Sequence, residues 1–172
     1  MIGYMDIEEQ VDYDFTRAVR RSFVRRVGAR LRGDPFSSRA PSFEEVVRDL
    51  GARNKLRLGR RLVAVEKVVG SVGRFRDFDG EFLPIRRSVG ERWKRVDRAF
   101  HLGVDLPPVE LYKIGEGYYV LDGNHRISVA RYQGVRWIEA EVTRLYMGKK
   151  SATSGCAAVD QETENAPHPA AA

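Results

Sequence analysis

The sequence predicts an α+β fold, because two long amphipathic segments are accompanied by short apolar runs with glycine or proline at their ends. Apolar residues recur every three or four positions in residues 12–32 and 88–103, a spacing typical of helices. Residues 109–114, 118–121 and 137–142 are rich in β-branched and aromatic side chains, which is typical of strands. Helices and strands are therefore both expected, joined by short turns.

Length and composition favour one globular domain. The chain has 172 residues, of which 42% are apolar and 31% charged. No run approaches the roughly 18 apolar residues needed to cross a membrane. The first six residues lack the basic start and apolar middle of a signal peptide. We therefore expect a cytoplasmic protein without a membrane span.

The C-terminal part of the chain is expected to be a disordered tail. Residues 151–172 are rich in Ser, Ala, Thr, Glu and Pro and contain no aromatic residue, so they bury too little apolar surface to offset the entropy of ordering. The only cysteine, Cys156, lies here and has no partner for a disulfide or a zinc site. No structural metal is predicted.

Positive charge is concentrated in the N-terminal half. Residues 1–76 hold 17 Lys/Arg against 10 Asp/Glu, whereas residues 77–172 hold 13 against 14. A basic N-terminal half of this kind favours an anionic partner such as DNA. A soluble arginine-rich helix without any such partner is the alternative.

A long helix is predicted from Asp12 to Arg32, ended by residues 33–35. An apolar stripe recurs every four residues, and arginines cover much of the remaining surface. This helix either packs on its own domain with its arginines solvated, or lies along a membrane or a phosphate backbone. The stripe consists of Phe15, Val19, Phe23, Val27 and Leu31.

The next segments predict a short helix, a loop and a strand. Residues 42–45 form a capping box that opens a helix to Leu50, and residues 51–59 read as a basic loop. Residues 62–69 predict a strand. Residues 70–74 then form either a plain turn or a glycine turn whose N–H groups approach a phosphate, with Ser71 and Arg74 as candidates for contact with outer phosphates. Residues 74–80 suit a partly exposed loop.

A second capping box, residues 88–91, predicts a helix that ends at Gly103. Trp93, Val96 and Phe100 are expected to face the core. His101, near the helix C-terminus, is interpreted as solvated or stabilised by the helix dipole.

The most informative segment is Asp122-Gly-Asn-His-Arg126, directly after the strand-like run 117–121. Asp-Gly between apolar runs is a hairpin signal, which is one interpretation. Helix formers at 130–131 and Gly134 favour a short helix over residues 127–133 instead. In that case free N–H groups beside an arginine make an anion site.

The order of these elements resembles the ParB N-terminal domain/sulfiredoxin superfamily. The resemblance is carried by Leu106-Pro-Pro-Val-Glu-Leu-Tyr-Lys113, Tyr119-Val-Leu-Asp-Gly-Asn-His-Arg126, Gly134 and Trp137-Ile-Glu-Ala-Glu-Val142, with residues 63–74 similar to the family's first strand. It covers about residues 60–145. It implies a small mixed sheet, and divides the chain into a basic helical region (1–58), a ParB/sulfiredoxin-like domain (59–146) and a tail (147–172).

The family's turn binds nucleotide phosphates, and this chain departs from each branch in a specific way. ParB proteins, which bind and hydrolyse CTP, carry Gly-Glu-Arg-Arg where this chain has residues 123–126, and the changes count against CTP hydrolysis. Sulfiredoxins require a cysteine at the place of Asn124, so sulfinic-acid reduction is excluded. Free-serine kinases carry Asp-Gly-His-His-Arg, which is most similar to residues 122–126.

The resemblance, the turn and the charge pattern together lead to three hypotheses of function. The first is nucleotide-phosphate binding, with CTP or ATP and Mg²⁺, in a regulator that associates with DNA. The second is an enzyme that transfers a phosphoryl group or hydrolyses a nucleotide or phosphodiester. The third is DNA binding through the basic N-terminal half.

The residues of the predicted site have distinct expected roles. Arg126 grips phosphate oxygens, and His125 donates to phosphate when protonated or shuttles a proton near neutral pH. Asp122 holds Mg²⁺ or accepts a proton, or alternatively is a buried cap that fixes the turn. The phosphate cradle is predicted to comprise Gly123, Asn124, His125, Arg126 and Ser128.

Overall fold

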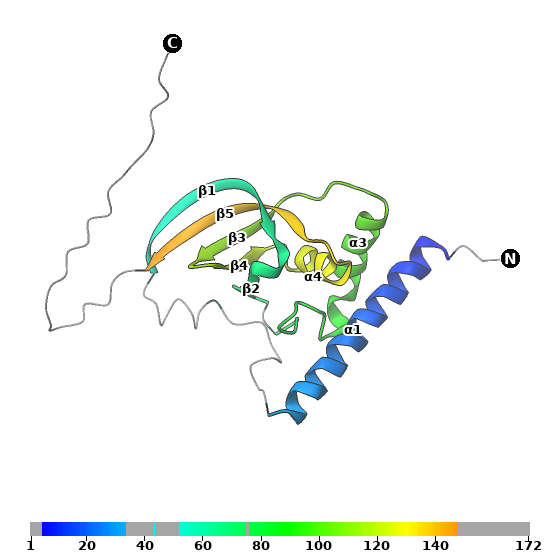
Figure 1. Cartoon of the computed structure of the whole chain (residues 1–172). Helices are drawn as coiled ribbons and strands as arrows, with labels where there is room; N and C mark the ends of the chain where they lie inside the picture. The colour runs from blue at the N-terminus through cyan, green and yellow to red at the C-terminus, as the bar shows by residue number, and fades with distance from the viewer. Residues whose placement is uncertain (1–4, 34–42, 44–51, 75, 148–172) are drawn as a thin grey trace, which may run out of the picture.

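The computed structural model describes residues 5–33, 43, 52–74 and 76–147, and it confirms an α+β fold with one five-stranded mixed sheet (Figure 1). In the described residues the helices are α1 (Ile7–Leu31), α3 (Gly90–His101) and α4 (Asn124–Tyr132), with 3₁₀ turns η2 (Val65–Lys67) and η3 (Arg87–Val89). The strands are β1 (Ala52–Ala64), β2 (Val68–Ser71), β3 (Val109–Ile114), β4 (Gly117–Asp122) and β5 (Trp137–Met147).

The sheet has the order β1-β5-β3-β4-β2. Antiparallel pairs join β1 to β5 and β3 to β4, and parallel pairs join β3 to β5 and β2 to β4. Because β2 and β4 are parallel, with Ser71 beside Val120, their carboxyl ends meet at the same edge of the sheet. The chain segments that leave both strands therefore come together there.

The central part of the sequence prediction is confirmed. β3 has the predicted bounds, and Gly115, at φ +55°, lies in the tight turn to β4. After β4 the chain forms α4, so the helical interpretation of the segment after Gly123 is correct and the hairpin interpretation is wrong. The last strand is longer than predicted and reaches Met147.

The basic loop predicted for residues 51–59 is wrong, because residues 52–59 belong to β1. Their polarity reflects exposed positions on an edge strand: Asn54, Lys55, Leu56 and Arg57 are all exposed. The strand is specified by its antiparallel pairing with β5, a partner about 80 residues away that local sequence patterns do not report. The strand predicted for 62–69 is instead interrupted by η2.

Helix α1 begins five residues earlier than predicted, at Ile7, whose N–H donates to the carboxylate of Asp6 over 2.7 Å. Its predicted apolar stripe is only partly correct: Phe15 is buried, but Phe23 and Leu31 are exposed. A repeat of four residues advances about 40° past a full turn at each step, so the stripe rotates away from the contact face. The buried face is Val11, Asp14, Phe15, Ala18, Ser22 and Ala29.

Three predictions for the middle of the chain need correction. Ser88 lies in η3 and makes no cap, since α3 begins at Gly90 without a side-chain cap. Phe78, predicted in a partly exposed loop, is fully buried. Trp93 is buried as predicted, whereas Phe100 is 43% exposed.

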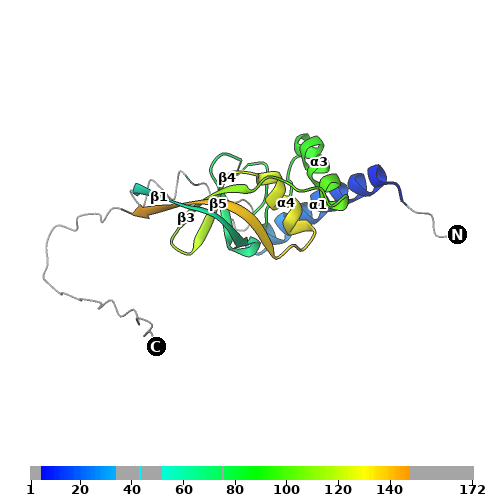
Figure 2. The ribbon, with the colours of Figure 1, turned by 90° about the horizontal axis from the view of Figure 1, so that it is seen from above.

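The three helices gather at one end of the sheet in both views (Figures 1 and 2). Helix α4 lies between two cores: Ile127 packs with sheet residues, and Val129 packs with side chains of α1 and α3. This position holds the N-terminus of α4 beside the end of β4. The helix core consists of Phe15, Ala18, Phe78, Val89, Trp93 and Val129.

Several predictions concern residues outside the described ranges. The helix expected from 42 to 50, except for Phe43, and the tail of residues 151–172 fall there. The division at residues 58 and 146 stays a prediction. Among the described helices, none has the length and apolar character required to span a membrane.

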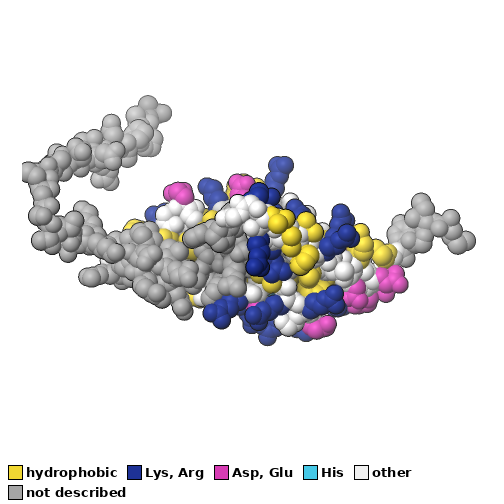
Figure 3. Space-filling model, turned by 90° about the horizontal axis from the view of Figure 1, so that it is seen from below, with side chains coloured by type: hydrophobic (Ala, Val, Ile, Leu, Met, Phe, Trp, Pro, Cys, Tyr) yellow, Lys and Arg dark blue, Asp and Glu magenta, His cyan; other side chains and the backbone are white. Residues whose placement is uncertain are grey.

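Seen from below, the face of the molecule is rich in basic side chains (Figure 3). Lys and Arg side chains are spread over the described part of this face, and fewer acidic ones lie at its N-terminal end and along its edges. On α1 the exposed arginines are Arg17, Arg20, Arg21, Arg25 and Arg30.

Candidate phosphate-binding site

The site is built where β4 gives way to α4. Strand β4 ends at Asp122, Gly123 takes the left-handed conformation with φ 100° and ψ 24°, and Asn124 begins the helix. The first N–H groups of a helix have no acceptor within it, so those at residues 124–126 point out of the helix start. The helix dipole and the free N–H donors together favour the binding of an anion at the start of α4.

Glycine is required at position 123 for two independent reasons. Its positive φ is unfavourable for a residue with a side chain. In addition, a Cβ here would lie 2.6 Å from Val109 Cγ1 and 3.0 Å from Arg126 Nε. The turn therefore brings the backbone close to β3, and Arg126 lies directly against it.

A cavity of about 350 Å³ opens at this helix start, and its wall is strongly basic. Of the eight residues that the sequence predicts for the site, residues 122–126 and Arg74 line this cavity, whereas Ser71 and Ser128 do not. Four arginines contribute to the lining, against one acidic residue, Asp122. The full lining is Arg74, Arg92, Arg95, Val96, Leu106, Pro107, Asp122, Gly123, Asn124, His125 and Arg126.

Arg126 already has partners for both terminal nitrogens. Nη1 donates to the backbone carbonyl of Pro107 and, over 3.0 Å, to that of Pro108. Nη2 pairs with Asp122 Oδ2 at 2.5 Å. Arg126 therefore fixes the loop before β3 to the turn, and its guanidinium reaches an anion only by exchanging one of these bonds.

Asp122 lies on the surface, with 71% of its side chain exposed. The alternative interpretation of Asp122 as a buried cap is therefore wrong. Its partner is Arg126, and in the described residues it belongs to no group of three potential metal-ligating side chains. Any Mg²⁺ held here would take its remaining ligands from water or from bound phosphates.

His125 is neutral at pH 7, contrary to the expectation that it donates as a cation or shuttles protons near neutrality. Burial lowers its pKa, and the charges of Arg74 and Arg92 lower it further, to about 4. The ring packs edge-on against Phe78, with centroids 5.4 Å apart. Both ring nitrogens are buried and have no hydrogen-bond partner among the described residues.

Asn124 is the second polar group without a complete set of partners. The residue is 7% exposed, and its Oδ1 accepts no hydrogen bond from the described residues. Buried polar atoms in native proteins normally have a partner, which is protein, water or ligand. Asn124 and His125 thus place unpaired polar atoms beside the free N–H groups of the helix start.

Ser71 and Arg74 reach the site because β2 runs parallel to β4. Ser71 is fully buried and does not line the cavity; its Oγ accepts the N–H of Arg74 over 3.3 Å. The predicted contact between Ser71 and phosphate is therefore corrected to a role in shaping the turn. Arg74 does line the cavity, with Nη1 at 3.3 Å from Asp77 Oδ2.

Ser128 is also corrected, because it points into the core instead of the cavity. It is fully buried and its Oγ accepts the indole N–H of Trp93 over 2.9 Å. A helix advances about 100° per residue, so a side chain at the fifth position of α4 lies on a different face from the turn. The hydroxyl joins α4 to α3.

Arg92 and Arg95 belong to the site but were not among the predicted residues. They lie one turn apart on α3, line the cavity, and form no ion pair with any residue that the structure describes. Their spacing on a predicted helix was visible in the sequence. Which neighbour they face depends on the packing of α3 against α4, which the local pattern does not contain.

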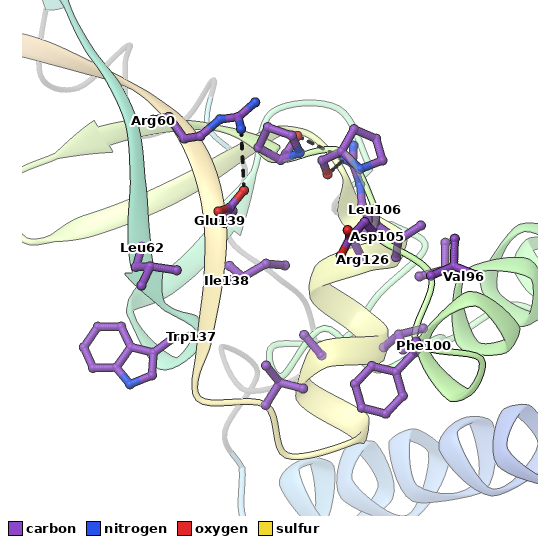
Figure 4. Close-up of a pocket in the computed structure, with 17 residues that line it drawn as sticks. Arg60, Leu62, Val96, Phe100, Asp105, Leu106, Arg126, Trp137, Ile138 and Glu139 are labelled. Atoms are coloured by element: carbon purple, nitrogen blue, oxygen red, sulfur yellow. Dashed lines mark hydrogen bonds and ion pairs between the residues drawn. The ribbon is translucent and has the colours of Figure 1, made fainter.

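A larger groove of about 970 Å³ adjoins the cavity (Figure 4). The two share Val96, Leu106, Pro107 and Arg126. Figure 4 shows Phe100 and Val96 on one side of the groove and Ile138 and Trp137 on the other. Much of its lining is therefore apolar, in contrast to the arginine-lined cavity beside it.

Comparison with known proteins gives one weak structural likeness. Sulfiredoxin from Arabidopsis thaliana is similar to this chain with a TM-score of 0.37 and 17% sequence identity, over 48% of this chain and 82% of that one. A likeness of this size carries no conclusion about family or activity. No family model and no curated protein matches the chain.

Proposed function

We propose that the chain binds the phosphate groups of a nucleotide at the N-terminus of α4. The observation that carries the proposal is the cavity in which four arginines surround a helix start with free N–H groups. A phosphate there receives hydrogen bonds from the backbone and charge from arginine, the two contributions that protein phosphate sites normally combine. No competing carboxylate other than Asp122 lines this cavity among the described residues.

The arginines divide into two groups by availability. Arg92 and Arg95 are exposed on α3 and have no ion-pair partner among described residues, so they are ready to take phosphate oxygens. Arg126 is held by Asp122 and by backbone carbonyls. In this proposal Arg126 shapes the turn, while Arg92, Arg95 and Arg74 supply most of the charge.

The adjoining groove favours a nucleotide, rather than a free phosphate ion, as the ligand. An apolar groove next to a phosphate site accommodates a base and ribose while the charged end stays at the arginines. Phe100 and Leu106 are partly exposed on its wall, at 43% and 39%. CTP and ATP, each with Mg²⁺, are the nucleotides we would test first.

Binding without rapid turnover is the form of the proposal that the residues support. A general acid or base works best with a pKa near the working pH. The pKa of His125 is lowered to about 4, and Asp122 is paired with Arg126. The enzyme alternative, phosphoryl transfer or nucleotide hydrolysis, is tested by product formation from labelled ATP or CTP with Mg²⁺.

Isothermal titration calorimetry of the full chain with ATP, CTP, GTP and pyrophosphate tests the proposal. We expect micromolar binding of at least one nucleotide, weakened at least tenfold in the double variant R92Q/R95Q. Arg98→Gln is the matched control: it also removes an arginine of α3, but one that pairs with Glu8 on α1. Equal binding by all three proteins, or no binding by the native chain, would refute the proposal.

A second candidate function is DNA binding through α1. Its support is the row of exposed arginines on α1 and the basic face of Figure 3. Helical arginines along one face suit contacts with a phosphate backbone, which are independent of sequence and sensitive to salt. The two functions use different arginines, so they can be separated by mutation.

A further inference from the structure

A cluster of three potential metal ligands lies where α1, α3 and α4 meet, away from the phosphate site. Asp14 comes from α1, and Asp97 and His101 come from one face of α3. One ligand atom from each lies within 4.8 Å of the other two. No other group of three His, Cys, Asp or Glu side chains in the described part of the chain comes together in this way.

The carboxylates of the cluster are buried to an unusual degree. Asp97 is fully buried, and the side chain of Asp14 is 8% exposed. Aspartates are almost never buried to this extent unless their charge is compensated. No arginine or lysine pairs with either of them in the described residues, and burial raises the pKa of Asp97. Compensation therefore comes from His101, from a proton on Asp97 or from a cation.

One oxygen of the cluster has no hydrogen-bond partner among the described residues. Asp97 Oδ1 accepts from Gln133 Nε2 over 2.8 Å, but Oδ2 is buried and accepts none. That oxygen points toward His101, whose Nε2 lies 3.6 Å away. An unpaired oxygen of a fully buried carboxylate is costly, and a bound cation would satisfy it.

The spacing of the ligand atoms matches a small coordination sphere. His101 Nε2 lies 3.0 Å from Asp14 Oδ2 and 3.6 Å from Asp97 Oδ2. Ligands at about 2.0 Å from a tetrahedral zinc ion are about 3.3 Å apart, between these two distances. Small side-chain rotations would therefore place all three atoms on one ion.

We propose that Asp14, Asp97 and His101 form a binding site for a divalent transition-metal ion, with Zn²⁺ as the best match. Two carboxylates balance the charge of the ion, and the imidazole selects transition metals over Mg²⁺ and Ca²⁺, which prefer oxygen ligands. The site joins α1 to α3, so metal binding stabilises the attachment of the N-terminal helix. This proposal is independent of nucleotide binding.

The surroundings supply second contacts to the ligands and an opening. Tyr132 Oη donates to Asp14 Oδ1 over 2.9 Å, and Gln10 Nε2 donates to Asp14 Oδ2 over 3.0 Å. Such hydrogen bonds orient the carboxylate that binds a metal. Asp14 and His101 also line a hollow of about 720 Å³, so one coordination position faces solvent.

The opening favours a small anion or water as the remaining ligand. The hollow is lined by Arg17, Arg20, Arg21 and Arg25, which oppose a bare cation but favour an anion bound to it. A metal ion that carries a phosphate or carboxylate in its open position would satisfy both sets of charges.

The competing explanation is a hydrogen-bonded network in which a proton on His101 takes the place of the metal. In that case the distance of 3.0 Å between His101 and Asp14 is an ordinary ion pair. Direct metal binding separates the two explanations, because a network without metal affinity leaves added Zn²⁺ in solution.

The experiment measures metal uptake by the full chain in a C156A/H168A background, which removes the cysteine and one of the two other histidines. Competition with a chromophoric chelator gives the zinc affinity, and Co²⁺ gives a visible absorption band whose intensity reports the coordination geometry. We expect one Zn²⁺ per chain, a dissociation constant of micromolar or below, and no competition by millimolar Mg²⁺.

Variants assign the ligands. Asp97→Asn and His101→Gln preserve shape and are each expected to weaken zinc binding at least 20-fold and to abolish the Co²⁺ band. Asp12→Asn is the matched control on α1, two residues from Asp14, with its side chain 65% exposed and paired with Lys94. It should retain full affinity.

The outcomes are decisive in either direction. Binding of one metal that is lost in D97N or H101Q but retained in D12N supports the site. No zinc uptake by the background protein, or equal uptake by D97N and H101Q, overturns it. Since the Co²⁺ spectrum is recorded on protein with all three ligands intact, a variant that fails to fold does not remove the test.

Discussion

At the scale of single residues, Gly123 determines whether the proposed phosphate site can form. Its φ of 100° and its approach to Val109 are needed to turn the chain from β4 into α4 within one residue. We predict that Gly123→Ala lowers the free energy of unfolding by about 3 kcal/mol, from the positive φ and the steric overlap together. Urea denaturation followed by circular dichroism measures the loss.

A second glycine separates these two causes. Gly103 also has a positive φ, 63°, but a Cβ there meets nothing within 4 Å. Gly103→Ala should therefore cost only about 1 kcal/mol, the conformational part alone. If both substitutions cost the same, close approach to Val109 is not what requires glycine at position 123.

His125 makes stability depend on pH in a defined window. Its pKa is about 4 in the folded chain, below the ordinary value of 6.5, first because of burial and then because of Arg74 and Arg92. Between pH 6.5 and 4 the unfolded chain binds a proton that the folded chain does not, so stability falls as pH falls. We predict a loss of about 2 kcal/mol across this window, reduced from the full shift because the ring lies beside an open cavity.

The effect is isolated by comparison with His125→Gln, which does not titrate. The difference in unfolding free energy between the native chain and this variant should shrink toward low pH by the stated amount. Bound pyrophosphate should raise the pKa of His125, because an anion favours the imidazolium. If the difference in unfolding free energy between the native chain and His125→Gln does not change between pH 7 and 4, the fold does not hold the His125 ring in its neutral form.

The sequence predicts some features of the site residues but not others. The turn at 122–126 was predicted, because glycine, an apolar strand and helix formers are local signals. The low pKa of His125 was not, because it depends first on burial and then on Arg74 and Arg92, which are 51 and 33 positions away. Protonation states follow from spatial neighbours that only the fold brings together.

At the scale of elements, the contact between α3 and α4 combines apolar packing with one fully buried hydrogen bond. Trp93 Nε1 donates to Ser128 Oγ in a fully buried setting. We predict that Ser128→Ala costs about 2 kcal/mol, because the indole N–H is left without an acceptor. Thermal and urea unfolding measure the loss.

The same variant tests the corrected role of Ser128. If the hydroxyl only joins the two helices, nucleotide affinity measured by calorimetry stays within about twofold of the native value. Loss of affinity with little loss of stability would instead return Ser128 to the phosphate cradle. Ser88→Ala, an exposed serine in η3, provides the control for the substitution itself.

The strands differ in how far their own residues predict them. β3 and the turn to β4 were predicted because a hairpin is specified by neighbouring residues. β1 was read as a loop over residues 51–59 because its exposed positions are basic and its partner β5 is distant in sequence. Long-range pairing overrides local propensity in such a strand.

At the scale of the whole molecule, the positive charge is divided between two surfaces. Arg17, Arg20, Arg21 and Arg25 line a hollow against α1, and a different set of arginines lines the cavity at α4. The composition predicted an anionic partner but not this division, because net charge carries no information about position. In our proposal, nucleotide and DNA therefore bind the same chain without sharing residues.

Because the two basic surfaces are separate, DNA and nucleotide binding should respond to different substitutions. Duplex DNA affinity should fall linearly with salt on a logarithmic scale, with a slope reduced by about 2 in R20Q/R21Q, since each phosphate contact contributes about 0.9. The variant R92Q/R95Q should leave that slope unchanged while losing nucleotide binding. Fluorescence anisotropy at several salt concentrations measures the slopes, and an excess of the bound nucleotide should not release the DNA. Release of the DNA by nucleotide would show that one surface binds both anions. The same slope in all three proteins would show that α1 does not contact DNA.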